Sequence, residues 1–282
     1  MKLIADSGST TTLWRVIKNN GEVAMEVVTK GINPYFQTRL EIEEEIQFQL
    51  LPKFPYYFHI DSVFFYGSGC TPAKIPFIKN ILEGCFIKHI EVSSDLLAAA
   101  RAVCGHHKGI VAILGTGSNS CYYNGDIVED NVSPLGFILG DEGSGAALGK
   151  ALISLLFKQR QYASLKQTFL DEMNFSEHHI VEYVYKAPFP NRFLASLSPF
   201  ILNHMDHPAI YQMVLDVFQS FIDLNLKQYA QIDEYPIHFV GSIAYHFRDY
   251  LEEALRASGV KMGTIVKDPM EGLTAFHSNQ SL

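Results

Sequence analysis

The feature that most constrains the fold is an order of expected strands and helices that occurs twice along the 282 residues. In residues 2–104, three strands precede a helix, and strand, helix, strand and helix then follow in turn. Residues 109–282 have the same order, with a mostly helical insertion at about 158–231. Short apolar runs bounded by Gly, Asn and Pro predict the strands. Because strands alternate with helices, we expect an α/β protein made of two like units.

Each copy starts with an apolar strand that runs into a turn of small residues. The first is LIADSGSTT at residues 3–11, and the second is VAILGTGSNS at residues 111–120. Glycine lets a backbone approach an anion closely, and successive N–H groups and hydroxyls donate hydrogen bonds to it. Two such turns at matching places predict a phosphate site, with ordinary tight turns as the alternative. The expected phosphate ligands are Gly8, Ser9, Thr10, Thr11, Gly115, Thr116, Gly117 and Ser118.

The first of these turns begins with a carboxylate. Asp6 stands where the second copy has Gly115. A carboxylate repels phosphate directly, but it can hold a Mg²⁺ ion that lies between it and the phosphates, through water. We therefore expect Asp6 to be the metal-side residue of a Mg²⁺-nucleotide site.

Carboxylates also stand at the starts of two expected helices. Asp95 follows IEVSS and opens an alanine-rich helix, where it is either an N-cap or a general base that takes a proton from a hydroxyl. Asp141 and Glu142 lie between a glycine-flanked loop and a long helix. These two residues either cap that helix or bind a sugar, because carboxylates accept hydrogen bonds from pairs of hydroxyls.

Small polar loops supply the remaining candidates. GINP contains Asn33, and YGSGCTP contains Ser68 and Gly69, at the ends of expected elements. In FVGSIA, Gly241 and Ser242 join a strand to a helix, where a flat adenine ring can lie against the backbone. We take the first three as candidate substrate contacts and the last two as candidate nucleotide contacts.

Composition and charge exclude several classes of protein. The formal net charge of −8, without a cluster of Lys and Arg, argues against a nucleic-acid partner. No apolar run approaches the roughly 18–20 residues of a membrane span, and the run before Asp6 is too short for a signal-peptide core. The four cysteines lack C-x-x-C spacing, which indicates neither a zinc site nor a disulfide framework. We expect a cytoplasmic protein with free thiols and no membrane partner.

Taken together and in this order, the motifs resemble those of the sugar kinase–Hsp70–actin superfamily of ATPases. Within it, the sequence is similar to the N-acetylglucosamine kinase branch, which is grouped with the BadF/BadG/BcrA/BcrD-type ATPases. DSGSTTT resembles the family's first phosphate motif, LGTGSNS the second and FVGSIA the adenosine motif. SSD, which ends at Asp95, matches the segment with the catalytic Asp. GINP and GDEGSG match the sugar-binding loops, which implies sugar contacts from Asn33, Asn119 and Asp141.

The resemblance also implies an architecture. It implies duplicated ribonuclease H-like (actin-like ATPase) domains, each a five-stranded mixed sheet with helices, with a cleft between them. The expected domains are residues 1–107, joined by the C-terminal segment 271–282, and residues 108–270. ATP and Mg²⁺ are the implied cofactors, and a homodimer is the implied assembly.

The predicted function is therefore an ATP-dependent kinase that phosphorylates an amino sugar, N-acetylglucosamine at its C6 hydroxyl, with Asp95 as general base. Three residues depart from the family pattern: Ser7 and Thr11 stand where relatives often carry Gly and Lys, and Leu135 stands where kinases that select the N-acetyl group often carry Trp.

Three alternatives remain open. One is a glucosamine kinase. Another is an ATPase that activates a partner enzyme, as the activators of 2-hydroxyacyl-CoA dehydratases do, although their paired cysteines for an iron–sulfur cluster have no counterpart here. A sugar sensor without turnover is the third, and the presence of Asp95 argues against it.

Overall fold

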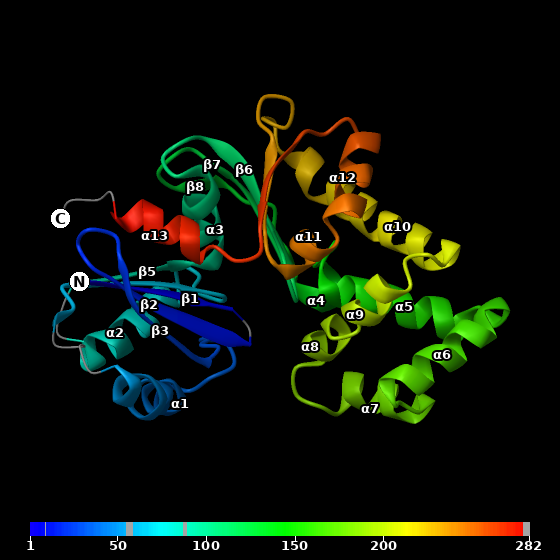
Figure 1. The fold of residues 1–282 in the computed structure, drawn as a ribbon, viewed down its shortest axis with the longest axis horizontal. Helices are drawn as coiled ribbons and strands as arrows, with labels where there is room; N and C mark the ends of the chain where they lie inside the picture. Colours follow the sequence, from blue (N-terminus) through cyan, green and yellow to red (C-terminus); the bar gives the residue numbers. More distant parts are fainter. Residues whose placement is uncertain (9, 55–58, 87–88, 279–282) are drawn as a thin grey trace. The chain divides into compact units, whose positions relative to one another are not determined.

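The chain forms two compact units in a computed structural model that describes residues 1–8, 10–54, 59–86 and 89–278 (Figure 1). Unit 1 comprises residues 1–107, 124–128 and the C-terminal segment from Asp268. Unit 2 comprises residues 108–123 and 129–267. None of the helices in the described ranges is long and apolar enough to cross a membrane.

Unit 1 is built on a five-stranded mixed sheet. Its strands, in spatial order, are β3 (Val23–Lys30), β2 (Thr11–Ile17), β1 (Lys2–Ser7), β4 (Ser62–Gly67) and β5 (His89–Ser94). β1, β2 and β3 pair antiparallel, whereas β1, β4 and β5 pair parallel. The carboxyl ends of three parallel strands therefore lie at one edge of this sheet.

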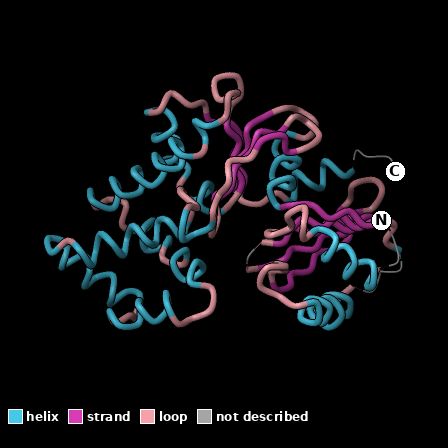
Figure 2. Tube along the Cα trace, turned by 180° about the vertical axis from the view of Figure 1, so that it is seen from behind, coloured by secondary structure: helices cyan, strands magenta, loops and turns pink. Residues whose placement is uncertain are grey.

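Helices cover both faces of the sheet in unit 1 (Figures 1 and 2). Side chains of successive strand residues point to opposite faces of the sheet, and Leu3 and Ile4 of β1 lie in different core clusters. Leu3 packs with α1 (Arg39–Glu44), the π-helical turn Glu45–Leu50 and α2 (Ile75–Cys85). Ile4 packs instead with α3 (Asp95–Cys104) and α13 (Met270–Ser278). A short 3₁₀ turn, Leu51–Lys53, follows the π-helical turn.

Unit 2 repeats the same sheet topology. Its strands, in spatial order, are β8 (Val128–Asp130), β7 (Ser118–Tyr123), β6 (Gly109–Leu114), β9 (Ile237–Val240) and β10 (Met262–Val266). β6 pairs antiparallel with β7 and parallel with β9, as β1 does with β2 and β4. This arrangement confirms the predicted α/β fold with two like units, each with a five-stranded mixed sheet.

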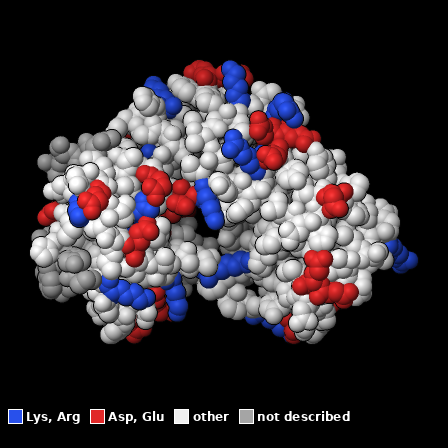
Figure 3. Space-filling view, viewed as in Figure 1, with Lys and Arg blue, Asp and Glu red and all other residues white. Residues whose placement is uncertain are grey.

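Helices pack with the sheet of unit 2 to form its hydrophobic core. They are α4 (Gly136–Leu139), α5 (Gly145–Lys158), α6 (Ala163–Met173), α7 (Glu177–Tyr185), α8 (Pro190–Ala195), α9 (Ser198–Asn203), α10 (Pro208–Leu224), α11 (Ser242–His246) and α12 (Arg248–Ala257). Ile110, Ala112 and Leu114 of β6 are fully buried in that core. On the face drawn in Figure 3, acidic and basic side chains are scattered among neutral ones.

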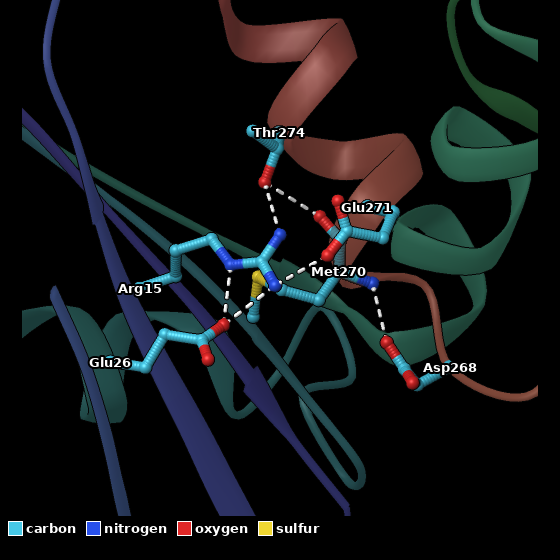
Figure 4. Close-up of polar contacts among 6 residues, drawn as sticks. All are labelled: Arg15, Glu26, Asp268, Met270, Glu271 and Thr274. Atoms are coloured by element: carbon cyan, nitrogen blue, oxygen red, sulfur yellow. Dashed lines mark hydrogen bonds and ion pairs between the residues drawn. The ribbon is translucent and has the colours of Figure 1, made fainter. Parts of the chain in front are cut away.

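A buried arginine fixes the C-terminal helix to the sheet of unit 1 (Figure 4). Arg15 of β2 donates to the Thr274 hydroxyl of α13 at 2.9 Å. It also donates to the carboxylates of Glu26 and Glu271, at 2.6 Å each. Thr274 donates in turn to the carbonyl of Met270, in the first turn of α13. The chain thereby returns to unit 1 and sets the position of the residues just before α13.

Candidate functional site

The edge of the unit 1 sheet where β1, β4 and β5 end brings several predicted residues together. The backbone N–H of Ser68, after β4, donates to the carbonyl of Ser7 at 2.9 Å. The Ser68 hydroxyl donates to Asp95 Oδ2 at 2.6 Å. Polar groups at the carboxyl ends of parallel strands are the usual place for ligand contacts in open α/β sheets. Ser68 and Asp95 therefore form a connected pair at a candidate site.

Asp95 is held as an oriented carboxylate. The N-cap of α3 is Ser94, whose hydroxyl accepts from the N–H of Leu97 at 3.2 Å, and Asp95 is the first helical residue. The interpretation of Asp95 as N-cap is therefore wrong. Its Oδ1 accepts from the N–H of Leu96 at 2.9 Å, while Oδ2 accepts from Ser68. Burial raises the pKa of Asp95, and these hydrogen bonds act in the opposite direction.

Asp6 lies near the end of β1, in the field of two other carboxylates. Burial, followed by the charges of Asp95 and Asp268, raises the pKa of Asp6 to about 7. Asp268 itself accepts from the N–H of Met270 at 3.1 Å, before the first turn of α13. A cation beside Asp6 would offset this repulsion.

The donor set around Asp6 suits Mg²⁺ carried by a phosphate. In the described part of the chain, no group of three or more His, Cys, Asp and Glu side chains could hold a metal ion. Mg²⁺ commonly uses only one or two carboxylates and completes its octahedron with waters and substrate phosphates. A single carboxylate at Asp6 fits that mode.

The first small-residue turn is closed by its own backbone. The N–H of Gly8 donates to the carbonyl of Thr11 at 3.0 Å, and the carbonyl of Thr10 accepts from Gly31 at 2.9 Å. Thr10 and Thr11 are exposed and available to a ligand. The predicted ligand Ser9 lies outside the described residues.

Ser7, one of the departures from the family pattern, has a side chain that bonds other residues of unit 1. It is fully buried, and its hydroxyl accepts from the N–H of Ile32 at 2.8 Å and bonds to the Thr12 hydroxyl at 2.7 Å. Its side chain therefore secures the segment that leads to Asn33 and does not face a phosphate.

Asn33 and Gly69 are in direct contact. Gly69 has φ of +77°, and a Cβ at this residue would lie 2.5 Å from Asn33 Oδ1. The N–H of Tyr35 donates to the same oxygen at 3.0 Å, and the N–H of Asn33 donates to Gln37 at 2.7 Å. The structure thus places the predicted sugar residues of unit 1, Asn33, Ser68, Gly69 and Asp95, on neighbouring loops.

In unit 2, three predicted motifs meet where β6 ends. The N–H groups of Gly145 and Ala146, in the first turn of α5, donate to the carbonyls of Gly115 and Thr116 at 2.8 and 3.1 Å. Gly241 has φ of +125°, and a Cβ there would lie 2.3 Å from the carbonyl oxygen of Leu114. Only glycine permits that approach. The second phosphate turn, the loop before α5 and the turn before α11, which starts at Ser242, are therefore one local cluster.

Asp141 lies against the second phosphate turn. A Cβ on Gly117 would lie 2.8 Å from Asp141 Oδ2, and the N–H of Ser118 donates to this carboxylate. Burial raises the pKa of Asp141 to about 6, while the Ser118 hydrogen bond and the charge of Lys150 act against the rise. Asp141 has φ of +55°, a conformation that non-glycine residues adopt at some energetic cost.

The loop of Asp141 and Glu142 does not cap a helix. α5 begins at Gly145, and its N-cap is Ser144, whose hydroxyl accepts from the N–H of Ala147 at 3.1 Å. The capping interpretation of both carboxylates is therefore wrong. Glu142 accepts from Asn225 Nδ2 at 3.2 Å, next to the end of α10. That bond ties the loop to the helical core.

Asn119, the remaining predicted sugar residue, is the second residue of β7 and is half-buried. Its Oδ1 accepts from Nδ2 of Asn131 at 2.9 Å. No motif points to Asn131 in the sequence, because the contact joins residues 12 positions apart across β7 and β8. The Asn-Gly pair at 124–125, which predicts a hairpin over residues 119–132, is the available signal in the sequence.

The chain is similar over its whole length to a solved structure named "Putative N-acetylglucosamine Kinase" from Porphyromonas gingivalis. The two are 44% identical, each is covered to 100%, and the TM-score is 0.95. A protein of the same name from Chromobacterium violaceum is 17% identical over 98% of each chain, with a TM-score of 0.76. A ROK family glucokinase from Streptomyces griseus, solved with glucose and AMPPNP, is 13% identical over 98% of this chain and 97% of its own, with a TM-score of 0.56.

The last two similarities concern the fold alone. No protein-family model matches the sequence, and no curated protein sequence matches it.

Proposed function

The chain belongs to the sugar kinases of the actin-like ATPase superfamily, and we propose that it is an ATP-dependent kinase that phosphorylates an amino sugar. N-acetylglucosamine is the proposed substrate, because it is named for the 44% identical protein from Porphyromonas gingivalis. The C6 hydroxyl is the proposed acceptor. Glucosamine is the alternative substrate, and a direct comparison of the two sugars decides between them.

The observation that carries the proposal is the oriented carboxylate of Asp95. Ser68 and the N–H of Leu96 occupy one lone-pair direction on each oxygen, which fixes the plane of the carboxylate. Burial raises its pKa and so its basicity, which favours proton removal from a hydroxyl. Neighbouring loops carry Asn33 and Gly69 as proposed sugar contacts, so an acceptor sugar and its base are supplied by the same edge of the sheet.

In the proposed reaction, the sugar hydroxyl oxygen attacks the γ-phosphorus of ATP. The new oxygen–phosphorus bond forms as the bond to the β–γ bridging oxygen breaks, and ADP leaves. Asp95 takes the hydroxyl proton. Such transfers depend mainly on positioning and on stabilisation of charge on the phosphoryl oxygens.

The proposed nucleotide contacts are the motif residues of the sequence. Asp6 would hold Mg²⁺, which neutralises charge on the phosphates when bound. Gly8, Thr10 and Thr11 of the first turn and residues 115–118 of the second turn are the proposed phosphate contacts. Gly241 and Ser242 are the proposed adenosine contacts, supported by the close approach of Gly241 to the end of β6.

Replacement of Asp95 tests the assignment. We expect Asp95→Asn to lower turnover by about 10²–10⁴, because a general base contributes a factor of this order. Binding of the sugar and of Mg²⁺-ATP, measured by calorimetry, should persist because the amide keeps the shape of the side chain. Asp216→Asn, on the exposed face of α10, is the matched control and should keep full turnover. Comparable turnover in Asp95→Asn would remove Asp95 from the role of base.

A further inference from the structure

The orientation of the Asn119 carboxamide is dictated by two donors. The N–H of Ser120 donates to Asn119 Oδ1 at 2.9 Å, and Asn131 Nδ2 donates to the same oxygen at 2.9 Å. Both partners are hydrogen-bond donors, so only the oxygen of the amide can face them. The NH₂ group of Asn119 therefore lies on the opposite side of the amide. Within the described part of the chain, no group accepts a hydrogen bond from it.

The orientation of the Asn131 carboxamide is also fixed, by three acceptors. Its Nδ2 lies 2.9 Å from Asn119 Oδ1, 2.6 Å from the carbonyl of Ser120 and 3.1 Å from the carbonyl of Val132. All three partners are acceptors, and two N–H hydrogens are shared among them. A reversed amide would place an oxygen against three oxygens, so these acceptors fix which end of Asn131 faces Asn119.

The segment that carries Asn131 is itself fastened to β7. The buried hydroxyl of Tyr229 bonds to Ser120 Oγ at 2.8 Å and accepts from the N–H of Val132 at 3.1 Å. Tyr229 is 1% exposed and Ser120 is fully buried. This bridge holds the residues on either side of the Asn119–Asn131 contact. The orientation is thus built into the protein before any ligand arrives.

An acceptor stands next to this donor. The carboxylate of Asp141 bonds to the N–H of Ser118, the residue that precedes Asn119. At the start of β7 the protein therefore offers a carboxylate, which accepts from a hydroxyl, and an NH₂ group, which donates to an oxygen.

We propose that Asn131 is a positioning residue that commits Asn119 to donate a hydrogen bond to a substrate oxygen. The inference rests on the proposed function in one respect, that Asn119 faces the sugar. The group that Asn119 contacts is a hydroxyl or a carbonyl oxygen. An ammonium group cannot replace it, because an ammonium has no lone pair to accept the bond.

The test compares the wild type with Asn119→Ala, Asn131→Ala and Asn131→Asp on N-acetylglucosamine and its monodeoxy analogues. The wild type should lose about tenfold in kcat/KM for the analogue that lacks the contacted oxygen, the value of one hydrogen bond. That penalty should vanish in Asn119→Ala and shrink to less than threefold in Asn131→Ala. In Asn131→Asp an oxygen replaces Nδ2 against Asn119 Oδ1 and the carbonyls of Ser120 and Val132, so the exposed Asp side chain should turn into solvent and the penalty should shrink as in Asn131→Ala.

Control measurements separate positioning from a general loss of structure. Asn20→Ala removes an exposed asparagine whose Oδ1 accepts from the N–H of Glu22 in a turn of unit 1, and it should keep the wild-type penalty. The KM for ATP and the melting temperature should change little in the Asn131 variants, because Asn131 is exposed.

The outcomes distinguish this inference from the proposed function. Wild-type protein that phosphorylates no sugar and binds none in calorimetry would overturn the proposed function, and this inference with it. Wild-type protein that is active, with the same deoxy penalties in both Asn131 variants as in the wild type, would overturn the role of Asn131 alone.

Discussion

Gly69→Ala should weaken sugar binding through Asn33, and the structure supplies a control for it. A Cβ at Gly69 would lie 2.5 Å from Asn33 Oδ1, closer than real Cβ contacts, and 3.1 Å from its Cγ, so the Asn33 side chain must move. Gly105 also has a positive φ, +59°, but a Cβ there would meet nothing within 4 Å. Alanine at either residue is strained by about 1–3 kcal/mol, because both have a positive φ that residues other than glycine rarely adopt. Only Gly69→Ala adds the displacement of Asn33.

The two variants should therefore separate stability from binding. Both should lower the free energy of unfolding in urea by about 1–3 kcal/mol. Only Gly69→Ala should raise the KM for the amino sugar, by about two- to tenfold, which corresponds to one neutral hydrogen bond. The KM for ATP should be unchanged in both. A wild-type sugar KM in Gly69→Ala, or an equal rise in Gly105→Ala, would refute the reasoning.

Two further predictions concern stability. Arg15→Ala should lower the free energy of unfolding by about 1–3 kcal/mol, because the buried guanidinium of β2 bonds Thr274 and Glu271 of α13 as well as Glu26 of β3. Lys18→Ala, which breaks the exposed ion pair with Glu22, is the control, and an equal loss in the two variants would contradict the role of Arg15 as an anchor. Asp6 has a pKa of about 7 in the folded protein, above its usual 3.8. Between these pH values the folded state binds a proton that the unfolded state does not bind. The stability that this proton gives to the folded state is lost as pH rises toward 7. Asp6→Asn should therefore stabilise the unliganded protein more at pH 8 than at pH 5 in urea titrations, and a difference independent of pH would refute the shift.

The repeated order of elements was sufficient to predict the fold, because it rests on local patterns. Apolar runs, alternation and the Asn-Gly turn at 124–125 are features of neighbouring residues. Helix interiors were harder to predict. The spacing of Leu40, Ile42, Ile46 and Leu50 predicts one α-helix over residues 38–50, whereas the structure changes to a π-helical turn at Glu45. Ile42, Ile46 and Leu50 are buried as expected, whereas Leu40 is 69% exposed.

Long-range contacts at the site could not be predicted from the sequence. Motif residues such as Ser68 and Asp95 were found by type and place, but their mutual hydrogen bond depends on how β4 and β5 pair. Asn131 and Asp268 belong to no motif. The first acts across a hairpin, and the second acts on Asp6 because the chain returns to unit 1 at α13. Such contacts follow from tertiary pairing, which leaves no periodic signal.

The most direct test of the central proposal is ADP release from Mg²⁺-ATP with no sugar, N-acetylglucosamine, glucosamine or glucose. An amino-sugar kinase should release ADP quickly only with its amino sugar, in equal amounts with a recovered sugar phosphate, and N-acetylglucosamine should give the highest kcat/KM. Steady ADP release that is indifferent to every sugar would contradict the proposal and favour an ATPase that acts on a partner protein.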